Sequence, residues 1–135
     1  MSHRVHEALN VQKALIFRIT HRKNLRWLLD NGLHSSTSEH LDPDFISVGN
    51  PELIRRRNRR VVPISPSGTL ADYIPFYFTP YSPMLLNIRT GHGGIPRQEN
   101  EDLVILVSSL RTLHEEGIPF VFTDRHAYLQ TANFY

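Results

Sequence analysis

The stretch ALIFRITHRKNLRWLLDNG, residues 14–32, decides the fold class of this 135-residue chain. It opens with a mainly apolar run that glycine or proline does not interrupt, which predicts a strand over residues 14–20. Three leucines then repeat at helical spacing, and they are Leu25, Leu28 and Leu29. We therefore expect a helix over residues 21–32 that ends at Gly32. A strand followed directly by a helix indicates a domain that mixes both element types.

Five further apolar or aromatic segments predict additional strands. They cover residues 60–65, 72–78, 84–88, 102–110 and 118–124. DLVILVSSL (102–110) is the strongest of them, and a short helix closed by Gly117 is expected after it. Pro75 removes a backbone donor from DYIPFYF, so that segment is predicted to be an edge strand or a bulge. Most connections are too short for a crossover helix, so we expect an α+β fold with a mixed or largely antiparallel sheet.

Composition is that of one globular domain. The chain has no cysteine, 40% hydrophobic residues and a net charge of +2. It contains no apolar segment long enough to cross a bilayer and no secretory signal, which favours a cytoplasmic setting. The sequence stops in the apolar pair Phe134 and Tyr135 without a turn or polar tail. Because termini usually lie in solvent, we expect a C-terminally truncated domain, the N-terminal portion of a longer protein.

Candidate chemistry is concentrated in two segments. The eight histidines form no metal-binding motif, and no P-loop or nucleophile elbow is present. Five arginines lie between Arg55 and Arg60, and this run fits either a solvated basic loop or a set of phosphate contacts. The aromatic segment 70–88 follows closely. It fits either a tyrosine-bearing sheet surface or a platform on which unpaired bases stack.

Several segments together resemble the DarT-like DNA ADP-ribosyltransferase toxins. They are FRITHRKNL, GNPELIRRR, TLADYIPFYFTPYSPMLLNI, EDLVILVSSL and PFVFTDRHAYLQTANFY. The resemblance implies an ADP-ribosyltransferase-like fold, with a split, mostly antiparallel β core and flanking helices. It also implies transfer of ADP-ribose from NAD to thymidine in single-stranded DNA, without a metal or a membrane. The implied partner is a macrodomain antitoxin that removes the modification.

The resemblance assigns roles to individual residues. Arg57, three positions after Ile54, corresponds to the functional arginine, with Arg56 as the alternative if the register shifts by one. Further NAD-contact candidates are Arg18, Ile19, Thr20, Trp27 and Ser35. Candidates on the thymidine side are Tyr77, Met84 and His126. Residues 36–60 resemble a mobile loop that covers NAD, within a single, incomplete domain over residues 1–135.

One family feature has no counterpart in the sequence. The family carries its catalytic glutamate in a downstream strand, and Glu115 and Glu116 precede the FVFTD segment, so neither can replace it. The resemblance therefore implies a chain that lacks transferase activity by itself. The alternative is a non-catalytic fragment that binds single-stranded nucleic acid or NAD.

Overall fold

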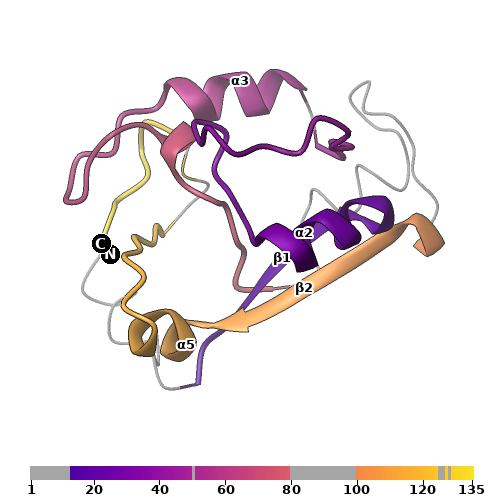
Figure 1. Ribbon diagram of the computed structural model, residues 1–135. Coiled ribbons are helices and arrows are strands. Elements are labelled where there is room, and N and C mark those ends of the chain that lie inside the picture. The colour runs from indigo at the N-terminus through magenta and orange to yellow at the C-terminus, as the bar shows by residue number, and fades with distance from the viewer. Residues whose placement is uncertain (1–12, 50, 80–99, 125–126, 128) are drawn as a thin grey trace.

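The computed structural model describes residues 13–49, 51–79, 100–124, 127 and 129–135 (Figure 1). Two strands, three α-helices and three short 3-10 helices lie in this part of the chain. In chain order they are β1 (Leu15–His21), η1 (Arg22–Asn24), α2 (Leu25–Asn31), α3 (Pro51–Arg59), η2 (Leu70–Asp72), η4 (Asn100–Asp102), β2 (Leu103–Ser109) and α5 (Leu110–Glu115). The predicted strand at 14–20, the helix after it, the strand at 102–110 and the helix that follows are therefore confirmed.

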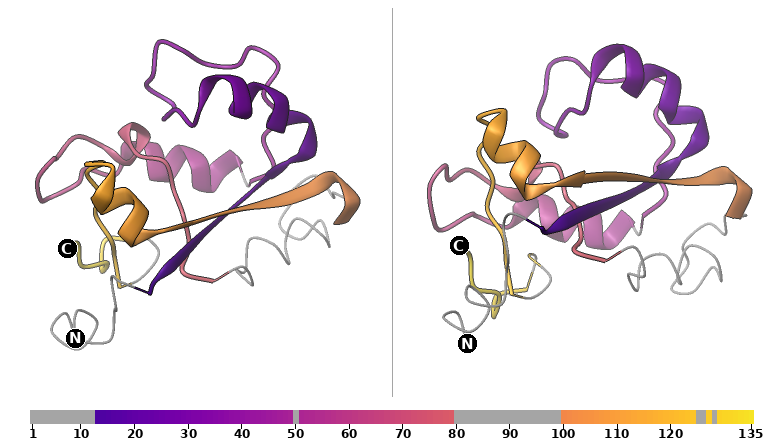
Figure 2. Two further views of the ribbon diagram at one scale, coloured as in Figure 1. Left: turned by 60° about the horizontal axis from the view of Figure 1, so that its bottom comes forward. Right: turned by 90° about the horizontal axis from the view of Figure 1, so that it is seen from below.

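The sheet of the described chain is one antiparallel pair. β1 and β2 run from Leu15 opposite Ser109 to His21 opposite Leu103. The strands cross with a marked twist, and α2 and α3 both lie above them in the orientation of Figure 1 (Figures 1 and 2). Because the two strands pair antiparallel and helices pack beside them, this is an α+β fold, as predicted.

Three predicted strands are reduced to isolated bridges in the described chain. These bridges join Val61 to Thr69, Phe17 to Tyr77, and Thr123 to Phe134. In the aromatic segment Pro75 has no N–H to donate, and only Tyr77 exchanges backbone hydrogen bonds with β1, at Phe17. The predicted strand at 84–88 lies outside the described residues.

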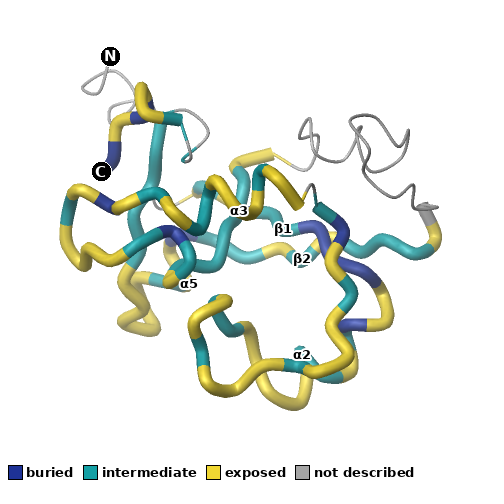
Figure 3. Tube along the Cα trace, turned by 90° about the horizontal axis from the view of Figure 1, so that it is seen from above, coloured by how far each residue is buried: buried dark blue, intermediate teal, exposed yellow. Residues whose placement is uncertain are grey.

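Buried residues concentrate in two places. Ile16, Ile19 and Thr20 of β1 are 3–5% exposed. A second cluster joins the segment after α3 to the C-terminal segment, and its members are Val62, Leu70, Ala132 and Phe134. The chain over residues 33–45 is largely exposed (Figure 3). The core therefore fixes β1 and the end of α3, the two elements that carry the arginines described below.

The segment expected as a mobile loop over residues 36–60 contains a helix. Residues 51–59 form α3, with Glu52 in its first turn and three arginines in its last. A carboxylate near the N-terminus and cations near the C-terminus both favour the helix dipole. The many polar residues of this segment suggest a loop, but over residues 51–59 they belong to a solvent-exposed helix. Whether residues 36–60 cover a ligand remains a prediction.

Gly32 ends α2 in a conformation that few other residues adopt. Its φ is 80° and its ψ is −177°, and its N–H donates to the Leu28 carbonyl. This region of backbone space is nearly exclusive to glycine. Gly32→Ala is therefore expected to lower the free energy of unfolding by about 1–3 kcal/mol. Urea denaturation measures the change, and the exposed Asp30→Ala on the same helix serves as control, with a change below about 0.5 kcal/mol. Equal midpoints for Gly32→Ala and the parent would contradict the expectation.

Candidate active site

α3 divides its arginines between solvent and the protein interior. Arg55 and Arg56 both pair with Glu52, at 2.8 and 3.4 Å, and their side chains are each 60% exposed. Arg57 lies one helical step further round, and its Nη2 donates to the Tyr73 carbonyl at 2.7 Å. Arg57 therefore differs from Arg55 and Arg56 in the direction of its side chain. Arg56 is the residue that would be the functional arginine if the match to the family shifted by one position.

A second arginine, Arg18 of β1, reaches the same aromatic segment that contains Tyr73. Arg18 Nη1 donates to the Pro75 carbonyl at 3.1 Å. Tyr77 is fixed beside it, because its N–H and carbonyl each bond to Phe17 at 2.8 Å. The carbonyls of Tyr73 and Pro75 are two residues apart, and each accepts one guanidinium. The aromatic segment thus holds both arginines along one short stretch of backbone.

Arg18, Arg57 and Tyr77 form a partly buried cluster, which we call the arginine–tyrosine cluster. Burial first, and then the charge of Arg18, lower the pKa of Arg57 to about 10, while Tyr77 acts in the opposite direction. Burial also lowers the pKa of Arg18. The pKa of Tyr77 is raised by burial, against the effect of the two guanidinium groups. Both arginines remain cations at neutral pH, so the cluster holds two like charges close together.

The cluster has no acidic counterpart in the part of the chain that the structure describes. Every ion pair found there involves a carboxylate of Glu52, Asp30, Asp102 or Glu115, and none of these reaches Arg18 or Arg57. Glu115 pairs with Arg111 at 2.9 Å on the surface of α5. Two partly desolvated cations that pair with none of the described carboxylates form a favourable site for an anionic group.

Ile19 and Thr20 are buried rather than presented to a ligand by their side chains. They are 5% and 3% exposed. Thr20 Oγ1 accepts a hydrogen bond from Asn24 Nδ2 at 3.0 Å. Their side chains therefore offer little surface to a ligand, and the NAD contacts expected of Ile19 and Thr20 remain predictions.

Asn24 belongs to none of the motifs that the sequence analysis singled out. It is 1% exposed, and its carboxamide makes two hydrogen bonds to the backbone of Ile46. With the bond to Thr20, the side chain ties the end of β1 to the chain that leads into α3. Asn24 directly precedes α2, and its side chain makes no capping hydrogen bond to that helix.

Trp27 and Ser35 lie in a separate group around α2. The ring of Trp27 packs against His34 and His40, with centroids 5.6 Å away in each case. Ser35 Oγ lies 3.3 Å from Thr37 Oγ1. Thr37 in turn donates to Asp72 at 2.7 Å, which fastens this segment to η2. Met84 and His126 lie outside the described residues, so their predicted roles remain predictions.

The fold and the cluster define an α+β domain in which strand β1 and helix α3 each supply one arginine to the aromatic segment at Tyr73–Tyr77. Residues 17–135 match the family described as DarT, ssDNA thymidine ADP-ribosyltransferase. The chain belongs to this family.

Curated relatives and solved structures agree with the match. A DNA ADP-ribosyl transferase of Escherichia coli O127:H6 is 56% identical over 128 residues, which are 95% of this chain and 59% of that protein. One from Thermus sp. is 42% identical over 89% of this chain and 56% of its own length. The structure of Thermus sp. 2.9 DarT in complex with ADP-ribosylated ssDNA has a TM-score of 0.83 and 41% identity, covering 92% of this chain and 58% of that one. The structure of Thermus sp. 2.9 DarT in complex with NAD+ has a TM-score of 0.75, and the match covers 90% of this chain and 57% of that one.

The chain therefore spans less than two thirds of the length of these relatives. The ADP-ribosyltransferase-like fold expected from the sequence is confirmed for the shared part. No described helix is long and apolar enough to cross a membrane. The described residues also include no group of three or more metal-binding side chains.

Proposed function

We propose that this chain forms the NAD- and DNA-binding part of a transferase that moves ADP-ribose from NAD to thymidine in single-stranded DNA. The observation that carries the proposal is the arginine–tyrosine cluster, with two cations and a phenol held at the edge of β1. Related chains of the same fold have been solved with NAD+ and with ADP-ribosylated ssDNA, which supports both ligands. We further propose a toxin role in the cytoplasm, opposed by a macrodomain antitoxin, as the resemblance implies.

The chemistry suits what the cluster offers. Cleavage of the nicotinamide–ribose bond gives an oxocarbenium-like centre, and the attacking thymine nitrogen must lose its proton. Arg57 keeps its proton at neutral pH, so it acts by electrostatic stabilisation of negative charge on the base or the phosphates rather than as a base. Tyr77 offers a flat ring and a hydroxyl for the thymine. An unpaired strand is the natural substrate because a stacked base could not be reached.

A carboxylate that stabilises the oxocarbenium-like centre is still needed. None of the described carboxylates pairs with Arg18 or Arg57. We therefore propose that residues 1–135 bind ligands but require a carboxylate from outside this stretch for transfer. Labelled ADP-ribose on DNA after incubation with the 135-residue chain alone would disprove this part of the proposal.

Binding of NAD is tested by thermal unfolding. NAD at ten times its Kd is expected to stabilise the chain by about 1.4 kcal/mol, which corresponds to a rise of several degrees in Tm. Arg57→Ala should remove most of this rise, whereas Arg55→Ala should retain it, because Arg55 points to solvent and pairs with Glu52.

The alternative function is a non-catalytic module for single-stranded nucleic acid. It predicts steeply salt-dependent DNA binding with no effect of NAD on Tm. A Tm that is unchanged by NAD at millimolar concentration, in a chain that still binds oligonucleotides, would favour that alternative.

A further inference from the structure

Two hydroxyl groups attach the exposed segment after α2 to the 3-10 helix η2. Ser36 Oγ donates to the Ala71 carbonyl at 2.9 Å, and Thr37 Oγ1 donates to Asp72 Oδ1 at 2.7 Å. Each bond joins residues that are 35 positions apart in the sequence. We call these four residues the loop–η2 contact. Both bonds are exposed to solvent, so the contact lies outside the core that holds the fold together.

The Asp72 carboxylate in this contact is held by two donors. Its Oδ1 accepts the Thr37 hydroxyl, and its Oδ2 accepts the Thr69 N–H at 3.0 Å. The bond from the Thr69 backbone, and then the bond from Thr37, lower the pKa of Asp72, so the carboxylate is charged and both bonds are charge-assisted. A Cβ placed on Gly68 would lie 2.5 Å from Oδ2, so the carboxylate already fills the space beside this turn. Asp72 therefore has one defined position, and Thr37 is bound to it there.

η2 leads directly into the backbone that holds the arginine–tyrosine cluster. Tyr73 follows Asp72, and the Tyr73 carbonyl accepts Arg57 Nη2 at 2.7 Å. The N–H of Leu70 in η2 donates to the Arg60 carbonyl at 2.9 Å, just after α3. η2 is therefore joined both to the end of α3 and to the start of the aromatic segment. A shift of η2 would move the carbonyl that orients Arg57.

Residues 33–40, which we call the connecting segment, are anchored to α2 on the other side of the contact. His34 Nε2 lies 2.9 Å from the Asn31 carbonyl, and His40 Nε2 lies 3.1 Å from Asn31 Oδ1. Both histidine rings pack against Trp27. The segment is exposed along most of its length (Figure 3). It therefore runs from α2 to η2 over the surface, where a ligand can reach it.

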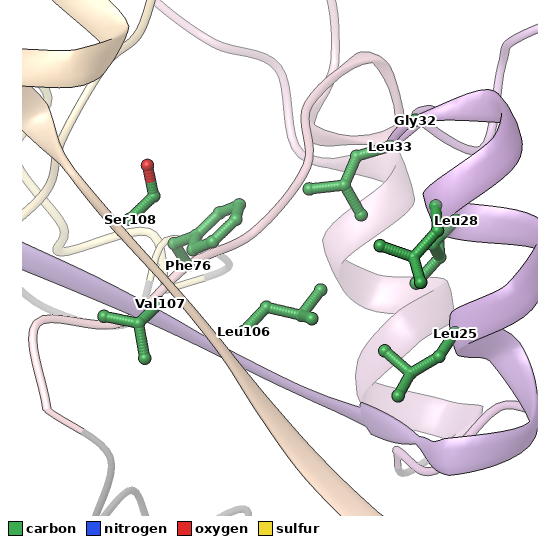
Figure 4. A pocket seen from close by; sticks show the side chains of 9 residues that line it. Leu25, Leu28, Gly32, Leu33, Phe76, Leu106, Val107 and Ser108 are labelled. Atoms are coloured by element: carbon green, nitrogen blue, oxygen red, sulfur yellow. The ribbon is translucent and has the colours of Figure 1, made fainter.

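An open groove lies between the start of the connecting segment and the cluster. Leu33 and Phe76 both line this groove, which has a volume of about 240 Å³ (Figure 4). Phe76 directly precedes Tyr77 of the cluster. Coupling between sites is carried by packed side chains and hydrogen-bond networks, and open space carries none. The loop–η2 contact is therefore a direct connection through which movement of the segment reaches Tyr73 and Arg57.

We propose that Asp72 is a positioning residue that couples the connecting segment to the arginine–tyrosine cluster through Thr37. A ligand that orders the segment fixes the Thr37 hydroxyl, which fixes Asp72 and, through the backbone, the Tyr73 carbonyl that orients Arg57. NAD on the segment, part of the predicted NAD-covering residues 36–60, and unpaired DNA at the cluster then bind cooperatively. Each ligand raises the affinity for the other by the same factor. The inference rests on the proposed function, since it takes NAD and single-stranded DNA as the two ligands.

Fluorescence anisotropy of a labelled thymidine oligonucleotide measures this coupling. The Kd of the oligonucleotide is determined for the 135-residue chain with and without saturating NAD at one salt concentration, and the ratio of the two values is the coupling factor. We expect a factor of about five or more for the parent chain. Thr37→Val removes the hydroxyl but keeps the size of the side chain, and it should lower the factor to less than about two. Thr37→Ser retains the hydroxyl and should restore the parent factor.

A double variant shows whether Thr37 and Asp72 act through one bond. Asp72→Ala should lower the coupling factor as far as Thr37→Val does, and the double variant should lower it no further, because the same connection is removed. Thr112→Val is the matched control, since the Thr112 hydroxyl makes its contact with Ser109 on α5, and it should keep the parent factor. Equal Kd values with and without NAD, in a parent chain that binds both ligands, would overturn the proposal.

Hydrogen exchange without ligands distinguishes this failure from failure of the proposed function. The Tyr77 N–H, which donates to the Phe17 carbonyl at 2.8 Å, reports on the aromatic segment. It should exchange at least about threefold faster in Thr37→Val than in the parent, whereas the β2 amides that bond to β1 should not change. If the parent does not bind NAD but Tyr77 still responds to Thr37→Val, the proposed function is wrong and the coupling stands. Unchanged exchange at Tyr77 would refute the coupling, whatever the chain binds.

Discussion

Replacing Arg57 by alanine is expected to abolish DNA modification while leaving the fold intact. Arg57 is the α3 arginine whose guanidinium bonds the Tyr73 carbonyl and lies in range of both Arg18 and Tyr77. Loss of one preorganised electrostatic group typically lowers kcat by about 10²–10³-fold. The measurement is transfer of labelled ADP-ribose to a thymidine oligonucleotide by a chimera in which residues 17–135 replace the matching part of the E. coli relative. The chimera is used because the 135 residues alone are expected to bind without transfer.

The same substitution should not destabilise the protein. Burial lowers the pKa of Arg57 in the folded state to about 10, below its ordinary value, so folding disfavours its charged form. This cost is present at neutral pH and is relieved as the pH rises through about 10. Alanine removes the cost but also the bond to Tyr73. After allowance for partial exposure, we expect a change in unfolding free energy between zero and about 1 kcal/mol of stabilisation.

Two matched variants on the same helix show which arginine of α3 is the functional one. Arg55→Ala and Arg56→Ala remove exposed partners of Glu52, and surface pairs of this kind contribute little to stability. Both variants should modify DNA nearly as well as the parent chimera. Normal activity of Arg57→Ala would refute the assignment, and loss of activity in Arg56→Ala instead would shift it by one residue.

Asn24→Ala is expected to be among the most destabilising single substitutions in the chain. The Asn24 carboxamide bonds Thr20 Oγ1 and both backbone groups of Ile46, at 2.9–3.0 Å. Its removal leaves the N–H and carbonyl of Ile46 without partners at a partly buried position, and each such group costs up to about 1–3 kcal/mol. We expect a loss of about 2–4 kcal/mol in unfolding free energy, measured by urea denaturation.

A matched asparagine in the neighbouring helix provides the control. Asn31 is exposed; its Nδ2 donates to the Trp27 carbonyl and its Oδ1 lies 3.1 Å from His40 Nε2. Because both contacts are at the surface, Asn31→Ala should cost at most about 1 kcal/mol. Hydrogen exchange should also quicken around Ile46 in Asn24→Ala, because the carboxamide holds that backbone. A stability loss as small as that of Asn31→Ala would contradict the central role given to Asn24.

The elements that the sequence predicted are those with a strong local pattern. β1 and β2 are short apolar runs without a breaker, and α2 has leucines on one face, so their own residues specify them. α3 was expected to be part of a loop, because its segment is polar and basic and the resemblance assigned it to a loop over NAD. The aromatic segment at 72–78 has the composition of a strand, but Pro75 and the lack of a continuous partner leave a single bridge at Tyr77.

The sequence by itself determined the family, through the resemblance of several segments, and the strand–helix units, through local pattern. The functional role of an arginine near position 57 stays a prediction. The sequence could not show that Arg18, from a distant strand, lies beside Arg57, nor that adjacent arginines on α3 point in different directions. Each residue of a helix is rotated by about 100° from the last, so only the packing of α3 against Tyr73 decides which side chain turns inward. The tertiary structure also gave Asn24 its role, since its partner Ile46 is 22 residues away.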